Sequence, residues 1–316
     1  MAKSHVGLET TATEAKSIIA LLEQTGRVLQ SNLLKALISA LPKEINDDVE
    51  KMTRFLLLLA ILDQQAESPS ARLTAINIYK TFGEELFNKP QNVLLRMDKL
   101  VPLKQGYKIS PAIGRVLPRF GWMVLRIGAF LIYEMTLNHK KFSTTLGQLS
   151  SPKEALHLLQ SNPVLEAVLR DKARRLFISW VGHPALGLDV SQGKWKISDF
   201  EMPVDGHVGK IFSRTGIVPQ VIHEAKEGKG TRWNVIIASQ MRPMIQEVVN
   251  NYSNDCIMAD HGAFQIGFNC CPDNLVDISC DSCKKFEPCQ IASLIGCKGH
   301  CILKEFCKRN LTWRAY

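Results

Sequence analysis

Residues 202–217 read MPVDGHVGKIFSRTGI and predict a short helix that begins after a capping aspartate. Asp205 stands at the mouth of a helix expected over residues 207–216, where backbone amides hold a carboxylate in place. Lys210 and Arg214 follow at i, i+4 spacing and therefore share one face of that helix. Taken alone, this pattern also fits an ordinary helix N-cap with a solvated basic face, so the rest of the sequence must distinguish the two interpretations.

Helical periodicity extends from this segment through most of the chain. Apolar residues recur at spacings of three and four, and capping or proline signals precede several of these runs. The best strand candidate is the short stretch 194–197. We therefore expect an all-α protein, with helices over residues 13–41, a second helix capped by Asp47 and Asp48, and further helices over residues 71–87, 112–137, 152–160, 163–181, 207–216, 235–252 and 260–268.

The composition is that of a globular protein. The chain has 316 residues, of which 46% are apolar and 22% are charged, and these values exclude a disordered or collagen-like chain. The apolar run 55–62 is too short to span a membrane, and the stretch 116–135 carries Arg119, Arg126 and Glu134, so no membrane partner is expected. Because the first residues lack an apolar signal core, we expect an intracellular protein, either cytoplasmic, nucleoid-associated or nuclear, that is not secreted.

The net charge of +9 is concentrated in the middle of the chain. Residues 101–235 hold 19 Lys and Arg against 10 Asp and Glu, whereas the remaining residues hold 20 of each. A polyanion such as nucleic acid is the partner that this distribution favours. A basic protein without such a partner is the alternative.

Cysteine placement is the most specific feature of the composition. Seven of the nine cysteines lie between Cys271 and Cys307. In a chain without a secretory signal, such a cluster indicates metal binding rather than disulfides.

With these features together, the 202–217 segment resembles the Val-Asp-Thr-His-Val…Arg…Gly signature of the helix-hairpin-helix DNA glycosylase superfamily, to which endonuclease III belongs. The resemblance implies that Asp205 is the catalytic carboxylate, which helps to cleave an N-glycosidic bond. Residues 62–67, LDQQAE, resemble the family's early glutamine segment, so Gln64 or Gln65 would enter the duplex where the target base leaves. Residues 260–271 resemble the helix that leads into the family's iron–sulfur loop.

The same resemblance implies a [4Fe–4S] cluster, with zinc as the alternative metal. Two cysteine sets approach the family spacing, and they share Cys289. The first is preferred because its last two intervals match the family pattern. It consists of Cys271, Cys280, Cys283 and Cys289, and the alternative set consists of Cys289, Cys297, Cys301 and Cys307.

The family's hairpin loop has no counterpart in this sequence. Gly187 stands where the family's Schiff-base lysine usually lies. The archaeal 8-oxoguanine glycosylase branch has a longer gap between its lysine and its aspartate, and by that resemblance Lys172 becomes the candidate nucleophile. The alternative is that Lys172 belongs to a basic helix face. The resemblance further implies that phosphates are contacted by Lys210, Arg214, Arg174 and Arg175.

The family topology implies two helical lobes that flank a DNA-binding cleft. One lobe would comprise residues 1–64 and 197–316, with the Cys-rich loop at about 270–307, and the other would comprise residues 65–196. The resemblance thus predicts a base-excision DNA glycosylase-like protein that binds duplex DNA and hydrolyses the N-glycosidic bond of a damaged or mispaired base. Whether the protein also cleaves the DNA strand is left open by the sequence. A non-catalytic nucleic-acid-binding protein on the same scaffold and a zinc-stabilised interaction module are the alternatives.

Overall fold

The fold is helical throughout the part of the chain that the structure describes. The computed structural model describes residues 10–109, 115–137, 140–186, 188–218, 240–271 and 301–308, and for residues 30–39 only the backbone. Within these ranges no strand forms, and the one β-type pairing is an isolated bridge between Ala66 and Ile109. The expected all-α class is therefore confirmed. The expected strand at 194–197 is wrong, because the amides of Lys194 and Trp195 donate locally to Ser191 and the 3-10 turn η3 (Ile197–Asp199) follows.

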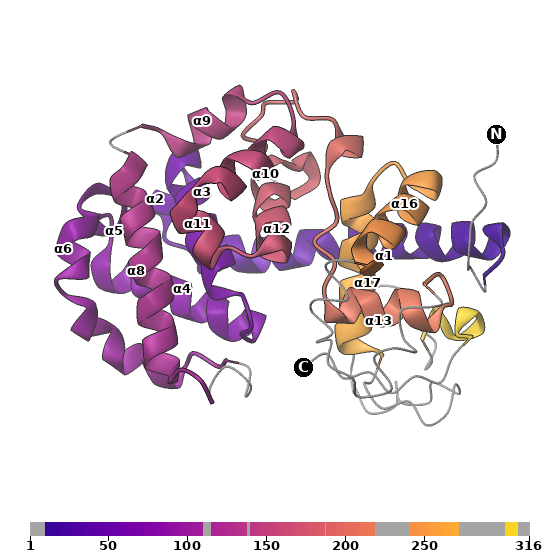
Figure 1. The fold of residues 1–316 in the computed structure, drawn as a ribbon, viewed down its shortest axis with the longest axis horizontal. Coiled ribbons are helices and arrows are strands. Elements are labelled where there is room, and N and C mark those ends of the chain that lie inside the picture. The colour runs from indigo at the N-terminus through magenta and orange to yellow at the C-terminus, as the bar shows by residue number, and fades with distance from the viewer. Residues whose placement is uncertain are drawn as a thin grey trace. The chain divides into compact units, whose positions relative to one another are not determined.

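The chain divides into two compact units (Figure 1). Unit 1 comprises Met1–Asn32 and Glu201–Tyr316, and unit 2 comprises Leu33–Phe200. The second boundary lies close to the expected one, but the first lies about 30 residues earlier than residue 64. The reason is α3, which packs against helices of unit 2 and forms its centre. The long helix α1 (Ala12–Ala40) contains the first boundary.

Unit 2 is built around α3 (Val49–Leu62). Asp48 caps this helix by accepting from the amides of Glu50 and Lys51, and every residue from Met52 to Leu62 is buried. A helix that is apolar on all sides must be covered on all sides, and α3 packs against α2, α4, α8, α9 and α12. The helices and turns of unit 2 are α2 (Lys43–Asn46), α3, α4 (Ser68–Phe82), α5 (Glu85–Asn88), α6 (Pro90–Leu94), η1 (Met97–Gln105), α8 (Arg119–Leu137), α9 (Phe142–Gln148), α10 (Pro152–Ser161), α11 (Pro163–Val168), α12 (Asp171–Gly182), η2 (Pro184–Leu186) and η3.

The single helix expected over residues 163–181 is two helices. α11 ends at Val168, Leu169 and Arg170 adopt extended backbone angles, and α12 begins at Asp171. The side chain of Gln64 satisfies the backbone at this break, because it donates to the Val168 carbonyl at 2.6 Å and accepts from the Arg170 amide at 2.7 Å. A contact across 104 residues therefore stabilises the interruption.

α8 is long and apolar enough to cross a membrane by length and composition, a test that the core helices of soluble proteins also pass. In unit 2, α8 packs against α3, α6, α11 and η1, and its Met123, Ile127 and Phe130 are fully buried. Its charged residues Arg126 and Glu134 are buried as well.

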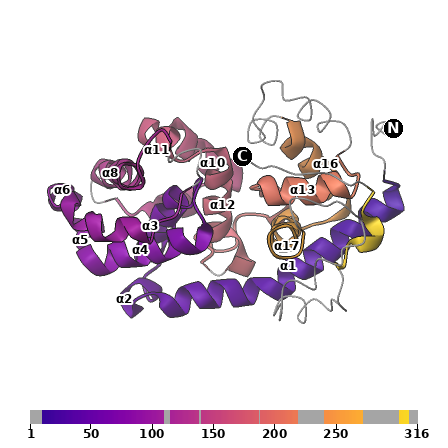
Figure 2. The ribbon, with the colours of Figure 1, turned by 90° about the horizontal axis from the view of Figure 1, so that it is seen from below.

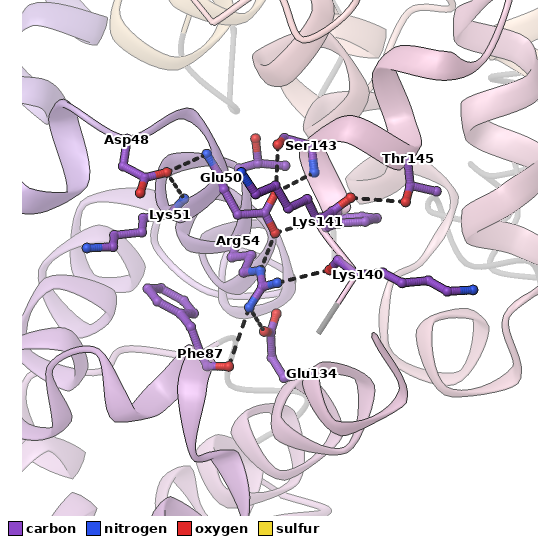
Figure 3. A network of polar contacts seen from close by, with 12 residues as sticks. Asp48, Glu50, Lys51, Arg54, Phe87, Glu134, Lys140, Lys141, Ser143 and Thr145 are labelled. Atoms are coloured by element: carbon purple, nitrogen blue, oxygen red, sulfur yellow. Dashed lines mark hydrogen bonds and ion pairs between the residues drawn. The ribbon is translucent and has the colours of Figure 1, made fainter. Parts of the chain in front are cut away.

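A polar network joins α3, α8 and α9 inside unit 2 (Figure 3). Arg54 donates to Glu50 at 2.5 Å and to Glu134 at 3.0 Å. Glu50 also accepts from the amides of Phe142 and Ser143, so it caps α9. Burial raises the pKa of Glu134 to about 8, against the opposing effect of Arg54.

Unit 1 contains the first part of α1, α13 (Gly206–Arg214), α16 (Arg242–Tyr252), α17 (Cys256–Asn269) and the short turn η6 (Lys304–Phe306). Figure 1 and Figure 2 both show α13 lying beside α17, with which it makes an extensive contact. α17 also packs on α1, where Gly26 meets the Met258 carbonyl and Gly262 meets the Leu22 carbonyl. A Cβ atom at either glycine would overlap the opposing carbonyl oxygen, so two glycines allow the backbones to touch.

We predict that Gly262→Ala lowers the free energy of unfolding by about 1–3 kcal/mol, because the added methyl group collides with backbone that cannot move aside. Gly128→Ala in α8 is the matched control, since no atom lies within 4 Å of its added Cβ, and it should raise stability by about 0.5–1 kcal/mol. Urea denaturation followed by circular dichroism measures both. If Gly262→Ala and Gly128→Ala changed the unfolding free energy by the same amount in the same direction, the close packing of α17 on α1 would be contradicted.

We also predict a pH effect from Glu134. Its pKa rises from 4.5 to about 8 on folding, so the folded state binds its proton more tightly than the unfolded state. Glu134 therefore makes stability fall as the pH rises through this window. In Glu134→Gln, the fall in unfolding free energy between pH 5 and pH 8 should be smaller than in the wild type. Glu44→Gln, at an exposed carboxylate, is the control, and its unfolding free energy should change with pH as in the wild type. An unchanged slope in Glu134→Gln would refute this assignment.

Candidate functional site

Asp205 caps α13 as the sequence predicts. Its Oδ1 atom accepts from the amide of His207 at 2.8 Å and from the amide of Val208 at 3.0 Å. The residue has extended backbone angles, and the helix begins directly after it, at Gly206. The carboxylate is half-buried, and the positive end of the helix dipole favours its negative charge. This arrangement suits a group that must remain anionic beside a developing cation.

Lys210 and Arg214 lie on one face of α13, but that face is internal. Each is only 1% exposed. The Lys210 ammonium donates to the carbonyl of Cys271 at 2.5 Å, and the Arg214 guanidinium donates to the Cys271 sulfur at 2.7 Å. The expectation that these two residues contact DNA phosphates is therefore wrong for this structure, because both charges point into unit 1 towards the end of α17.

Cys271 is held where these two cations meet. Its amide donates to the Ile266 carbonyl, which closes the last turn of α17, and its side chain is buried. The last residue of α13 also contacts the C-terminal segment, because the Lys308 amide donates to the Arg214 carbonyl at 2.8 Å. The residue next to Lys308 is Cys307. One helix of unit 1 thus contacts segments from both sides of the Cys-rich region.

The surroundings of Cys271 fit a metal ligand. A guanidinium that donates to sulfur stabilises the thiolate, which is the form that binds metal. Among the described cysteines, which are Cys256, Cys270, Cys271, Cys301 and Cys307, no two are joined by a disulfide. Cys280, Cys283, Cys289 and Cys297 lie outside the described residues, and the residues that are described contain no group of three or more potential ligands that could hold a metal ion.

His207 belongs to an aromatic group that sequence reasoning missed. Its ring lies edge-on to Phe264 and to Phe268, with centroids 5.8 Å and 5.3 Å away. Phe264 and Phe268 lie on α17 with ring planes 7° apart. The signal in the sequence is their i, i+4 spacing, which places two aromatic side chains on one helix face.

The glutamine segment of unit 2 is only partly available for contacts with DNA. Gln64 is buried, and both ends of its amide are used at the break between α11 and α12. The expectation that Gln64 enters a duplex is therefore corrected. Gln65 is half-buried and has a positive φ of 58°, a strained conformation for a residue with a side chain. Strain of this kind is common at functional sites, so Gln65 is the stronger of the two candidates.

The basic residues after Arg170 lie on the first turns of α12. Lys172 and Arg174 are half-buried, and burial lowers the pKa of Arg174. Arg175 forms an ion pair with Asp171 one turn earlier. Lys172 belongs to unit 2 and Asp205 to unit 1. Gly187 lies outside the described residues.

Arg126 is a further buried cation, which in the sequence serves only as an argument against a membrane span. It is 3% exposed, donates to the Val168 carbonyl at the end of α11, and lies over the Trp122 ring at 4.3 Å. Burial lowers its pKa to about 10. A cation at a helix C-terminus interacts favourably with the helix dipole, so its role is structural.

In comparisons with known proteins, no protein-family model, curated protein or solved structure matches the chain.

Proposed function

We propose that this chain is a base-excision DNA glycosylase-like protein that binds duplex DNA and hydrolyses the N-glycosidic bond of a damaged or mispaired base, with Asp205 as the catalytic carboxylate. The proposal rests on the first turn of α13. Asp205, which the resemblance identifies as the catalytic carboxylate, is the N-cap of that helix. Asp205 is half-buried, oriented by two amides and supported by the helix dipole.

The proposed chemistry needs a fixed negative charge. The bond between C1′ of the sugar and the base nitrogen breaks, its electron pair leaves with the base, and positive charge develops on the sugar. A carboxylate in the position of Asp205 stabilises that charge and can accept a proton from the water that then bonds to C1′. By the resemblance, Lys172 stays the candidate amine for strand cleavage.

The charge distribution supports a polyanionic partner. Unit 2 holds 23 Lys and Arg against 15 Asp and Glu, so it carries eight of the nine excess positive charges. With Lys210 and Arg214 buried, phosphate contacts would come from exposed residues of unit 2. Between residue 101 and the end of unit 2, the exposed lysines and arginines among the described residues are Lys104, Lys108, Arg115, Arg119, Lys140, Lys141, Lys153, Arg170, Lys194 and Lys196.

An iron–sulfur cluster is the proposed cofactor, and Cys271 is its proposed first ligand. Arg214 would donate to that ligand's sulfur, and Lys210 would hold its backbone. When bound, the cluster would supply a rigid cross-link for the Cys-rich segment. Zinc is the alternative metal for the same thiolates.

A non-catalytic nucleic-acid-binding protein is the second candidate function. The observation that favours it is that Gln64, Lys210 and Arg214, three residues expected to contact DNA, all have structural roles instead. Under this alternative Asp205 is only a cap. Binding would then be salt-sensitive, and no base would be released.

We predict that Asp205→Asn lowers base release by about 100-fold or more while leaving DNA binding intact. The asparagine side-chain oxygen can still accept from the His207 and Val208 amides, so the cap survives, whereas Asp205→Ala should cost about 1 kcal/mol of stability. Release of free base from a panel of duplexes, each with one damaged or mispaired base, gives the activity. Asp199→Asn is a nearby control that should keep it.

Two results would contradict the proposal. Wild-type protein that binds DNA with strong salt dependence but releases no base from any duplex would establish the non-catalytic alternative. Unimpaired release by Asp205→Asn would show that another group is the catalytic carboxylate.

A further inference from the structure

α8 turns apolar side chains towards solvent and buries its charged ones. Within residues 120–137, every residue that is not buried is uncharged, and Leu125 and Ile132 are 51% and 44% exposed. The two charged residues of this stretch, Arg126 and Glu134, are 3% and 4% exposed. A surface helix normally has the opposite arrangement, with its charged residues in water and its apolar residues inside.

The apolar residues that remain accessible lie on one side of the helix, which we name the outer face of α8. They recur at spacings of three and four, as one side of a helix requires. The outer face consists of Gly121, Val124, Leu125, Gly128, Ala129, Ile132, Met135 and Thr136. The other sides of α8 are covered, and Figure 2 shows the helix nearly end-on between α6 and α11, with which it packs. Open space lies over the middle of the outer face, because no atom lies within 4 Å of a Cβ atom added at Gly128.

The surface of α10 in the same unit has the usual character. Its exposed residues are all polar, and they are Lys153, Glu154, His157, Gln160 and Ser161. The apolar outer face is therefore particular to α8 and does not reflect a generally apolar surface of unit 2.

The outer face lies in the most basic part of unit 2. Residues 89–141 hold ten Lys and Arg against two Asp and Glu, an excess of eight that equals the excess of the whole unit. Exposed cations stand at both ends of α8, and they are Arg115 and Arg119 at its start and Lys140 and Lys141 after its end. The same segment contains six of the eleven exposed large hydrophobic side chains among the described residues, so apolar and cationic groups are concentrated together.

These charges disfavour a second copy of the chain as the group that covers the outer face. If two α8 helices paired in antiparallel orientation, Arg119 would face Lys140 of the other copy. In parallel orientation each of these cations would face its own counterpart. Like charges are brought together in both cases, and this opposes association.

The chemistry of the outer face also disfavours nucleic acid and protein. Aliphatic side chains offer neither hydrogen bonds to base edges nor an aromatic ring for stacking. Protein interfaces carry hydrogen bonds across the contact, and apart from Thr136 the outer face has no side chain that can form one. Hydrocarbon chains require no such bonds, and anionic headgroups match the flanking cations.

We propose that the outer face of α8 lies on the surface of an anionic lipid bilayer, with its aliphatic side chains among the acyl chains and the cations at both ends of the helix beside the headgroups. This contact differs from a membrane span, which the sequence argues against, because α8 keeps its neighbours in unit 2 and only its outer face meets lipid. The inference goes beyond the proposed function and does not depend on it.

The test is sedimentation of the full chain with vesicles made of equal parts of phosphatidylcholine and phosphatidylserine, and with vesicles of phosphatidylcholine alone. The wild type should bind the mixed vesicles about 10-fold or more tightly than the neutral ones, and added salt should weaken that binding. The double variant Leu125→Gln/Ile132→Gln should bind the mixed vesicles about 10- to 100-fold more weakly, because two half-exposed aliphatic side chains no longer enter the lipid.

The double variant Leu73→Gln/Ile197→Gln is the matched control. Leu73 on α4 and Ile197 in η3 are 54% and 37% exposed and also belong to unit 2, so this variant should bind vesicles as the wild type does. Thermal unfolding of both double variants shows that the fold is retained, since all four substitutions are at exposed positions. Both should keep the wild-type affinity for duplex DNA.

Three results would overturn the proposal. The first is a wild-type protein that does not bind the mixed vesicles, and the second is equal vesicle binding by the wild type and Leu125→Gln/Ile132→Gln. The third is a dimer in sedimentation velocity that this variant abolishes, in a protein that does not bind vesicles, because a second copy would then cover the outer face. Base release reports on Asp205 and not on α8, so the two proposals can fail separately.

Discussion

Unit 1 depends on one constraint, which is that the backbone of α17 touches two other helices. Gly262 meets α1 and Gly267 meets α13, and neither position has room for a side-chain carbon. The contact with α13 fixes the first turn of that helix, where Asp205 lies. It also places the end of α17 so that Cys271 reaches Lys210 and Arg214. The candidate catalytic group and the candidate metal ligand are therefore located by the same helix.

Burying Lys210 and Arg214 carries a desolvation cost that the fold must offset. Two positive charges that are 1% exposed need acceptors, and the backbone and sulfur of Cys271 provide two of them. A sulfur that accepts from a guanidinium is stabilised as the thiolate. The two cations thus favour the metal-binding state of Cys271, and a metal bound there would in turn link α13 to the Cys-rich segment.

The sequence predicts local features of this protein better than long-range ones. The caps at Asp48 and Asp205 are confirmed, because a side chain that accepts from an amide two or three residues later is a local interaction. The sequence does not predict the break between α11 and α12, since the distant Gln64 stabilises it. The expectation that the basic face of α13 contacts phosphate fails because i, i+4 spacing reveals a shared face but not what covers it. That face is buried because α17 packs closely on α13, and the close packing depends on a glycine whose contact partner the sequence does not reveal.

The most direct test is the metal content of the 316-residue chain, purified anaerobically, with iron, sulfide and zinc measured on the same sample together with the visible absorption spectrum. We predict a brown protein with about four irons and about four sulfides per chain, as a [4Fe–4S] cluster ligated by Cys271 requires. A colourless protein that contains zinc, or no metal, would contradict the cluster and remove a main support for the glycosylase proposal.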